Sequence, residues 1–213
     1  MHRRSYLATT VGTALTAGLA GCSSILGQSS PEELADVEPD REYPAPTLGD
    51  GDVTVEVYTD FTCPSCHSFQ ADIFPTLESE LIEPGEITYR HTDFPIPVED
   101  EAAPMANAAR AVQNETATDE EPAGEFFAYK HVLYENDYTS DEDLAAAAEN
   151  VGVDADIVTD ALEDGTYYPT IAADRERGEE AGVEGTPSVA VDGELLDDPF
   201  DTDGIIQAVD DAA

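Results

Sequence analysis

Basic side chains are scarce in this chain. Lys and Arg together number 8 against 48 Asp and Glu, which gives a formal net charge of -40 at pH 7. The only lysine is Lys130. Nucleic-acid binding depends on lysine and arginine contacts to phosphate groups, so the composition excludes nucleic acid as a partner.

Aromatic side chains make up only 8% of the residues, and strong acidity with few aromatics is also typical of disordered chains. Here, however, the acids are spread between apolar runs such as 53–58 and 188–191. Proteins of halophiles resemble this pattern, because at molar salt the Debye length falls to about 3 Å and repulsion between carboxylates fades. We therefore expect one folded, salt-adapted domain that loosens in dilute buffer.

Acidic residues are absent from residues 1–31, although they crowd the chain from Glu32 onward. Arg3 and Arg4 precede a mildly apolar run over residues 7–20, which is the order of a secretory signal. The run contains several Gly and Thr residues and is less apolar than the stretch of about 20 residues that usually spans a membrane. A cleaved signal is therefore favoured over an uncut anchor helix.

Two short motifs within this leader refine the prediction. Residues 3–7, Arg-Arg-Ser-Tyr-Leu, resemble a twin-arginine export signal, and residues 19–22, Leu-Ala-Gly-Cys, resemble a lipobox that ends on the lipid-bearing cysteine. We expect residues 1–21 to be the signal peptide and Cys22 to carry lipid. Residues 22–50, rich in Ser and Pro, are then a flexible linker. The domain over residues 51–213 is expected outside the cell membrane, tethered to it.

Cysteine is also scarce, with 3 residues in the chain. If Cys22 carries lipid, Cys63 and Cys66 remain as a pair. A structural disulfide closing so short a loop stabilises little, whereas a dithiol can cycle in an oxidising compartment. Metal binding is the alternative, but zinc takes four ligands, and the only additions are histidines at scattered positions. These are His67, His91 and His131.

The surrounding pattern places the pair at the start of a helix. A β-branched run over residues 53–58 predicts a strand, and apolar residues at every fourth position predict a helix after it. The apolar series is Phe69, Ile73, Leu77 and Leu81. Pro64 suits the first helical position, and Pro75 should kink the helix near Ala71.

Cys63 is therefore expected at the helix amino terminus. Free backbone N–H groups and the helix dipole favour a thiolate there, so Cys63 is predicted as the nucleophile. Cys66 follows one turn later, close enough to close a disulfide, and is predicted as the resolving thiol. The chemistry needs no cofactor beyond this pair.

A second motif lies near the carboxyl end. Residues 185–188, Gly-Thr-Pro-Ser, precede an apolar run and the pair Asp192-Gly193, which predicts a strand, a tight turn and a strand. Taken alone, Pro187 is expected to follow an ordinary trans bond, because only about 5 to 6% of X-Pro bonds are cis.

Residues 50–213 as a whole resemble the DsbA-like branch of the thioredoxin superfamily. Five segments carry the resemblance: residues 60–66, 93–96, 102–112, 126–127 and 182–188. The resemblance implies that Pro187 is cis and lies against the disulfide, while the backbone of Thr186 pairs with an incoming peptide. Pro64 and Ser65 would support the same site.

The resemblance also implies an α/β thioredoxin fold. Its expected elements are a strand over 53–59, a helix over 64–82, a strand over 87–93, a helical insertion over about 100–183, a hairpin over 187–197 and a final helix. The insertion would separate the βαβ half from the C-terminal hairpin and helix. Ser140 with Asp143 is expected to cap one helix of the insertion.

One departure from the resemblance concerns proton transfer. Relatives often bury an acid six residues before the first cysteine, as proton acceptor for the resolving thiol, and that position here is Val57. Glu56 should point to the opposite face of the strand. Asp60, water or no special group stays open as the proton path. His67 is interpreted as a helix-surface histidine, and His91 and His131 as structural.

These inferences predict a membrane-tethered thiol:disulfide oxidoreductase. It would act on exported proteins and be reset by an unidentified redox partner. Oxidase is the commonest role in this branch, but related dithiols span about -120 to -270 mV. Thr186 before the proline also occurs in isomerase-like relatives, so reductase and isomerase stay open. An extracytoplasmic copper or zinc carrier is the alternative from another class.

Overall fold

The computed structural model describes residues 30–97, 99–136, 138 and 140–213. The predicted signal peptide, its twin-arginine motif, the lipid attachment at Cys22 and the first part of the linker lie outside these residues. Across the described ranges, no helix has the length and apolar character needed to cross a membrane.

A mixed five-stranded sheet forms the centre of the fold, in the order β1-β3-β2-β4-β5. The strands are β1 (Thr47–Leu48), β2 (Val53–Thr59), β3 (Ile87–Asp93), β4 (Ser188–Val191) and β5 (Glu194–Leu195). β2 and β3 pair in parallel, and the other neighbours pair antiparallel. The predicted strands over 53–59 and 87–93 are both confirmed, because their β-branched residues suit a buried sheet.

The two faces of β2 carry different side chains. Val55 and Val57 are fully buried and pack with apolar residues of the helices that follow β2. Tyr58 lies on the other face and packs with Phe94 and Val183. Because strand side chains alternate, Glu56 shares the face of Tyr58.

The helix predicted over 64–82 is divided. α1 (Pro64–Asp72) ends before Ile73, α2 (Phe74–Leu77) follows, and η2 (Glu78–Ile82) is a π-helical turn. Pro75 has no N–H to donate to the carbonyl of Ala71, which interrupts the helical hydrogen bonds at the predicted place.

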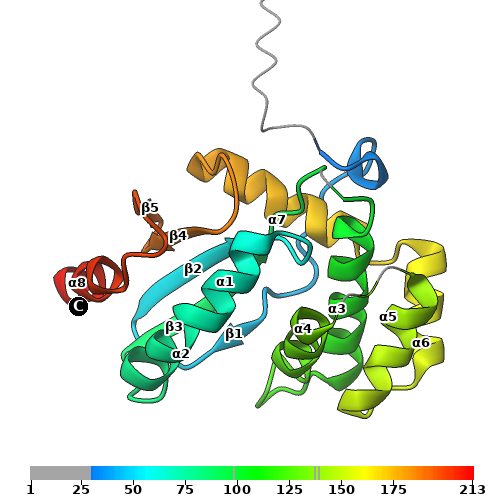
Figure 1. Ribbon diagram of the computed structural model, residues 1–213, viewed down its shortest axis with the longest axis horizontal. Helices are drawn as coiled ribbons and strands as arrows, with labels where there is room; N and C mark the ends of the chain where they lie inside the picture. Colours follow the sequence, from blue (N-terminus) through cyan, green and yellow to red (C-terminus); the bar gives the residue numbers. More distant parts are fainter. Residues whose placement is uncertain (1–29, 98, 137, 139) are drawn as a thin grey trace, which may run out of the picture.

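The helical insertion is confirmed and lies between β3 and β4 along the chain. Its elements are α3 (Ala102–Thr116), α4 (Phe126–Glu135), α5 (Asp141–Ala148), η3 (Glu149–Val151), α6 (Ala155–Asp164) and α7 (Tyr168–Ala181). Helices α3 to α6 gather on one side of the sheet, opposite α8 (Thr202–Ala212), as Figure 1 shows. The predicted cap is present, since the Ser140 hydroxyl accepts a hydrogen bond from the N–H of Asp143 at 3.2 Å.

The C-terminal hairpin is also confirmed. Asp192 and Gly193 have φ of 48° and 86°, the left-handed values that a two-residue turn between β4 and β5 requires. The Asp201 side chain caps α8 by accepting a hydrogen bond from the N–H of Gly204 at 3.0 Å.

Part of the segment predicted as a linker, residues 22–50, is packed against the domain. Leu34, in the short helix η1 (Glu32–Leu34), is buried at 5% exposure, and the Tyr43 ring lies 5.2 Å from that of Tyr167. β1 pairs with the edge of β3. A two-residue strand carries no periodicity that a sequence pattern can register, so the packed part of this segment was missed.

Candidate active site

Cys63 occupies the N-cap position of α1, and Pro64 follows as its first residue. The Cys63 carbonyl accepts hydrogen bonds from the N–H groups of Cys66 and His67 at 3.0 and 3.2 Å. Both thiols are free, with Cys63 8% and Cys66 2% exposed. Pro64 and Ser65 are exposed beside them. The predicted placement of Cys63 at a helix amino terminus is confirmed.

The Thr186–Pro187 bond is cis, as the resemblance implied. The loop before β4 brings this bond against the dithiol, because the Cys63 thiol donates a hydrogen bond to the Thr186 carbonyl at 3.3 Å. The Thr186 hydroxyl is buried and has no nitrogen or oxygen partner among the described residues. It is therefore available to the sulfur atoms.

The two thiols are opposite in acidity. A hydrogen bond from the Cys66 thiol is the main cause that lowers the pKa of Cys63 to about 5, against the opposing effect of burial. The Thr186 hydroxyl and the N–H groups of Cys66 and Ser65 add to the lowering. Burial, followed by the hydrogen bond to Cys63, raises the pKa of Cys66. At neutral pH the pair therefore holds one thiolate and one thiol, and the thiolate is Cys63.

Asp60 organises the loop between β2 and α1. One carboxylate oxygen accepts hydrogen bonds from the N–H and hydroxyl of Thr62 at 2.6 and 2.7 Å, and the other accepts from the N–H of Ile96 at 2.7 Å. The Asp60 N–H donates to the Cys66 sulfur at 3.5 Å. Burial raises the pKa of Asp60. Its carboxylate is thus engaged in holding the loop.

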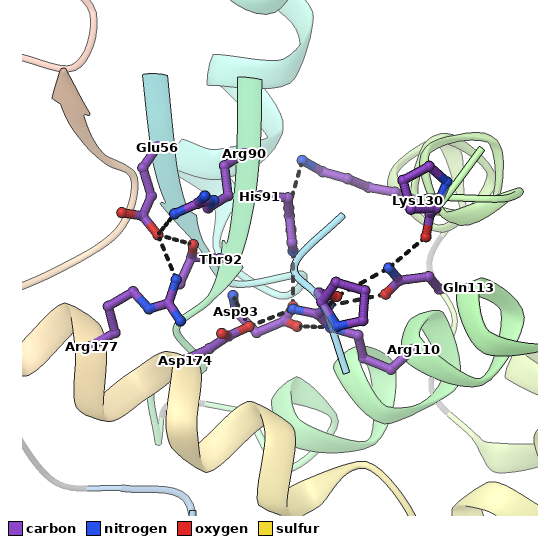
Figure 2. A network of polar contacts seen from close by, with 12 residues as sticks. Glu56, Arg90, His91, Thr92, Asp93, Arg110, Gln113, Lys130, Asp174 and Arg177 are labelled. Carbon is purple, nitrogen blue, oxygen red and sulfur yellow. Dashed lines mark hydrogen bonds and ion pairs between the residues drawn. The ribbon is translucent and has the colours of Figure 1, made fainter. Parts of the chain in front are cut away.

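Glu56 lies away from the dithiol, as predicted. It is held on the opposite sheet face by hydrogen bonds from the hydroxyls of Tyr58 at 3.1 Å and Thr92 at 2.7 Å. Arg177 and Arg90 approach its carboxylate at 3.6 and 4.0 Å (Figure 2). No carboxylate from β2 therefore reaches the space behind Cys66 on the face of Val57.

A buried polar network joins β3 to the helices α3, α4 and α7. We call it the Arg110 network, and it comprises His91, Asp93, Arg110, Lys130 and Asp174 (Figure 2). His91 Nε2 lies 2.9 Å from Asp93 Oδ1, and Arg110 Nε donates to Asp93 Oδ2 at 2.7 Å. Arg110 also pairs with Asp174.

Burial and neighbouring charges shift the pKa values of the groups in this network. Burial by itself raises the pKa of Asp93, but Arg110 and His91 outweigh that effect and lower it to about 2. Burial raises the pKa of Asp174 to about 6. Burial and the Lys130 charge lower the pKa of His91 to about 4, so His91 is neutral at neutral pH.

From the sequence, His91 is interpreted as a structural histidine, and no role is predicted for the other four members of this network. They come from β3, α3, α4 and α7, and no motif joins them. The one signal was compositional, because Lys130 is the only lysine in the chain.

The other histidines occupy different settings. His67 Nε2 lies 2.7 Å from the Phe61 carbonyl oxygen, and its ring centroid is 4.3 Å from that of Tyr134. His131 is exposed, 3.4 Å from Glu135. Among the residues that the structure describes, no group of three or more His, Cys, Asp or Glu side chains is placed to hold a metal ion.

Known proteins with the same architecture were found by comparison. The family model described as thioredoxin matches residues 47–211. Disulfide bond formation protein D of Bacillus subtilis is 21% identical over 174 residues, covering 78% of this chain and 75% of that protein.

Two crystal structures extend the likeness. Oxidised BdbD from Bacillus subtilis superposes with a TM-score of 0.70 at 21% identity, over 82% of this chain and 95% of that one. DsbA of Chlamydia trachomatis gives a TM-score of 0.68 at 18% identity, over 81% and 92%. The chain therefore belongs to the thioredoxin family, and it is a DsbA-like thiol:disulfide oxidoreductase.

Proposed function

We propose that this protein is an oxidase that introduces disulfides into exported proteins through the Cys63–Cys66 pair, while tethered outside the cell membrane. The observation that carries the proposal is the asymmetry of the two thiols. Cys63 is an acidic thiol at a helix amino terminus beside Thr186, and Cys66 is a buried thiol with a raised pKa. A dithiol whose more exposed member is acidic is the reactive kind.

The proposed cycle begins with the Cys63–Cys66 disulfide. A client thiolate attacks the Cys63 sulfur, the disulfide bond breaks, and Cys66 leaves as a thiolate that takes up a proton. A second client thiolate then attacks the client sulfur of the mixed disulfide, and Cys63 leaves as a thiolate. The client has lost two electrons and the protein has gained them. An external redox partner must take these electrons to restore the disulfide.

Two features support the oxidising direction. A low pKa makes Cys63 a good leaving group in the second step. It also stabilises the reduced protein, which raises its tendency to accept electrons. The Bacillus subtilis relative is named disulfide bond formation protein D, and that name agrees with this direction.

The client is proposed to bind beside the cis proline. An extended client segment would pair with the backbone of Thr186, and the exposed Pro64 and Ser65 would contact it from the other side of Cys63. Such a segment would lie next to the reacting atom, because the Thr186 carbonyl oxygen is 3.3 Å from the Cys63 sulfur.

A redox titration tests the direction. The purified domain is equilibrated in glutathione buffers of defined ratio, and the fraction of reduced Cys63–Cys66 is measured by mass after alkylation. We expect a potential towards the oxidising end of the range, near about -120 mV. A potential as low as that of thioredoxin, about -270 mV, would overturn the oxidase proposal in favour of the reductase alternative.

Metal carriage is the alternative from another class, and the same preparation tests it. Stoichiometric copper or zinc in the purified protein, together with thiols protected from alkylation until a chelator is added, would replace the oxidoreductase cycle. We expect alkylation of the reduced protein to be independent of chelator.

Membrane attachment is proposed through lipid on Cys22 after removal of residues 1–21. Cells that express Cys22→Ser should release the protein into the medium, whereas the unaltered chain should sediment with membranes. Protein that stays membrane-bound in the Cys22→Ser strain contradicts the lipid anchor. The matched control is Ser23→Ala, which leaves the proposed lipobox cysteine intact.

Salt adaptation is the remaining part of the proposal. At a net charge of -40, repulsion between carboxylates opposes folding in dilute buffer, and salt screens it. The melting temperature of the domain should rise steeply from 0.1 to about 3 M sodium chloride. An equal rise in sucrose, which screens no charge, would point to solvent exclusion instead.

A further inference from the structure

The space behind Cys66 contains polar groups whose partners are missing. The Tyr89 hydroxyl is buried without a hydrogen-bond partner within the described part of the chain, and the buried hydroxyls of Thr59 and Tyr134 have only each other. Position 57 is a fully buried valine, so β2 brings no carboxylate here. The buried Cys66 thiol must ionise in every exchange cycle, and β2 supplies no carboxylate beside it.

Lys130 reaches the same region from α4. It is 3% exposed, its Nζ lies 3.3 Å from His91 Nδ1, and the same atom lies 5.4 Å from the centre of the Tyr134 ring. Tyr134 in turn stacks on His67, the residue after Cys66. Figure 2 shows the Lys130 side chain extending from α4 towards His91 on β3.

The Lys130 charge is not neutralised by an ion pair. Within the described residues no carboxylate lies within 4.0 Å of its ammonium, whereas Arg110 is paired with both Asp93 and Asp174. A buried ammonium without an acid is costly. Burial lowers the pKa of Lys130 to about 8, and a negative charge on Cys66 opposes that lowering. The ammonium and the Cys66 thiolate therefore stabilise each other.

His91 orients the lysine. Asp93 accepts a hydrogen bond from His91 Nε2–H, which leaves the lone pair of Nδ1 for a Lys130 N–H. The low pKa of His91 keeps the ring in this neutral form. The Arg110 network thus holds the lysine in place without neutralising its charge.

We propose that Lys130 takes part in thiol exchange by supplying, behind Cys66, the charge and the proton exchange for which β2 offers no acid. The proposal rests on the roles of Cys63 and Cys66 given above.

When a client thiolate attacks Cys63, the disulfide bond breaks and its electron pair leaves on Cys66. The Lys130 ammonium stabilises this thiolate and passes it a proton, directly or through a buried hydroxyl. In the reverse direction, which starts from the mixed disulfide between Cys63 and a client, the neutral Lys130 amine accepts the proton of the Cys66 thiol. The Cys66 thiolate then attacks the Cys63 sulfur, the mixed disulfide breaks, and the client thiolate leaves.

The lysine can exchange its proton with solvent. A groove of about 540 Å³ runs between α4 and the α1–α2 pair, and Lys130 lines it together with His67 and Tyr134. Water in this groove returns the proton after each cycle.

Other titratable groups surround the lysine and must be controlled in any pH measurement. They are Tyr89, His91 and Asp93 of β3, Cys66 and His67 of α1, Glu78 across the groove, Arg110 of α3, and His131, Tyr134 and Glu135 of α4.

The test follows the two thiols separately. Reduced protein is mixed with an aromatic disulfide that releases a coloured thiolate. The first release reports attack by Cys63, and the second reports resolution by Cys66. In Lys130→Met we expect an unchanged first phase and a second phase slowed by a factor of about 10², with its pH profile moved to higher pH.

Control variants separate this role from a structural one. Lys130→Arg keeps the charge but cannot accept a proton, so it should recover only part of the second phase. His131→Gln, an exposed neighbour on α4, should leave both phases unchanged. Because Lys130→Met removes a costly buried charge, its melting temperature at pH 7 should equal or exceed that of the unaltered chain.

A second phase in Lys130→Met with the unaltered rate and pH profile overturns the proposal. If instead Cys63→Ser retains the first phase, the underlying roles of the two cysteines fail, so the two failures are distinguishable.

Discussion

The Cys63 sulfur lies 3.3 Å from the carbonyl oxygen of Thr186, the residue that precedes the cis proline. The Thr186 hydroxyl is buried beside it without a nitrogen or oxygen partner in the described ranges. One residue thus presents a carbonyl to the protonated thiol and a hydroxyl to the thiolate. This contact joins the start of α1 to the cis-proline loop before β4.

Removing that hydroxyl should weaken the thiolate. In Thr186→Val the backbone keeps its carbonyl, but the donor to the Cys63 thiolate is lost. Hydrogen bonds to charged groups contribute about 1.5 to 3 kcal/mol, so the pKa of Cys63 should rise from about 5 by roughly 1 to 2 units. The absorbance of the thiolate at 240 nm, followed against pH, measures this. Thr186→Ser keeps a hydroxyl and should stay close to the unaltered value.

The division of labour between the thiols predicts opposite behaviour of their serine variants. Cys63→Ser should abolish disulfide exchange with a dithiol peptide, because Cys66 is buried and its pKa is raised. Cys66→Ser should form the mixed disulfide and hold it, because no resolving thiol follows. Non-reducing electrophoresis separates the outcomes. Exchange retained by Cys63→Ser would refute the mechanism.

The dithiol should make the stability of the reduced protein depend on pH. The folded pKa of Cys63 is depressed from 9.0 to about 5. Ionised Cys63 therefore stabilises the reduced fold fully above pH 9, and this contribution is lost as pH falls through 5. The oxidised protein has no such group.

Thermal unfolding of both redox forms between pH 5 and 8 measures the difference. We expect the melting temperature of the reduced form to rise relative to that of the oxidised form as pH increases through this range. A constant difference would contradict the low pKa of Cys63. Cys63→Ser, which has no thiol to ionise there, is the control.

Much of this site was readable from local pattern. The β-branched run of β2 and the helical spacing after Pro64 placed Cys63 at a helix start, and the structure agrees within a residue. Glu56 was assigned to the opposite face by strand alternation alone. These inferences succeeded because each depends on a period of two or four residues within one element.

The Arg110 network was not readable in the same way. Lys130, His91 and Asp174 are separated along the chain by dozens of residues and meet only after the insertion folds onto β3. β1 was missed for a related reason, because its two residues form a strand only by pairing with Arg90 and Tyr89. Tertiary contacts, not local propensity, create both features.

The last prediction concerns the contribution of the Arg110 network to stability. Arg110 is 1% exposed and pairs with Asp93 and Asp174, so Arg110→Met leaves two buried carboxylates without their paired cation. Breaking a buried ion pair costs about 3 to 5 kcal/mol, and denaturant unfolding at pH 7 should show a loss of that size.

The loss in Arg110→Met should shrink in acid. Without the arginine both carboxyls have raised pKa values, so the folded state gains protons more readily than the unfolded state and stability falls as pH rises. In the unaltered chain the sign is opposite for Asp93, whose pKa of about 2 makes its contribution disappear only as pH falls through that value. Arg110→Met with Asp174→Asn removes one of the stranded charges and should recover part of the loss. Equal stability of the single and double variants would mean that Asp174 is already protonated when Arg110 is absent.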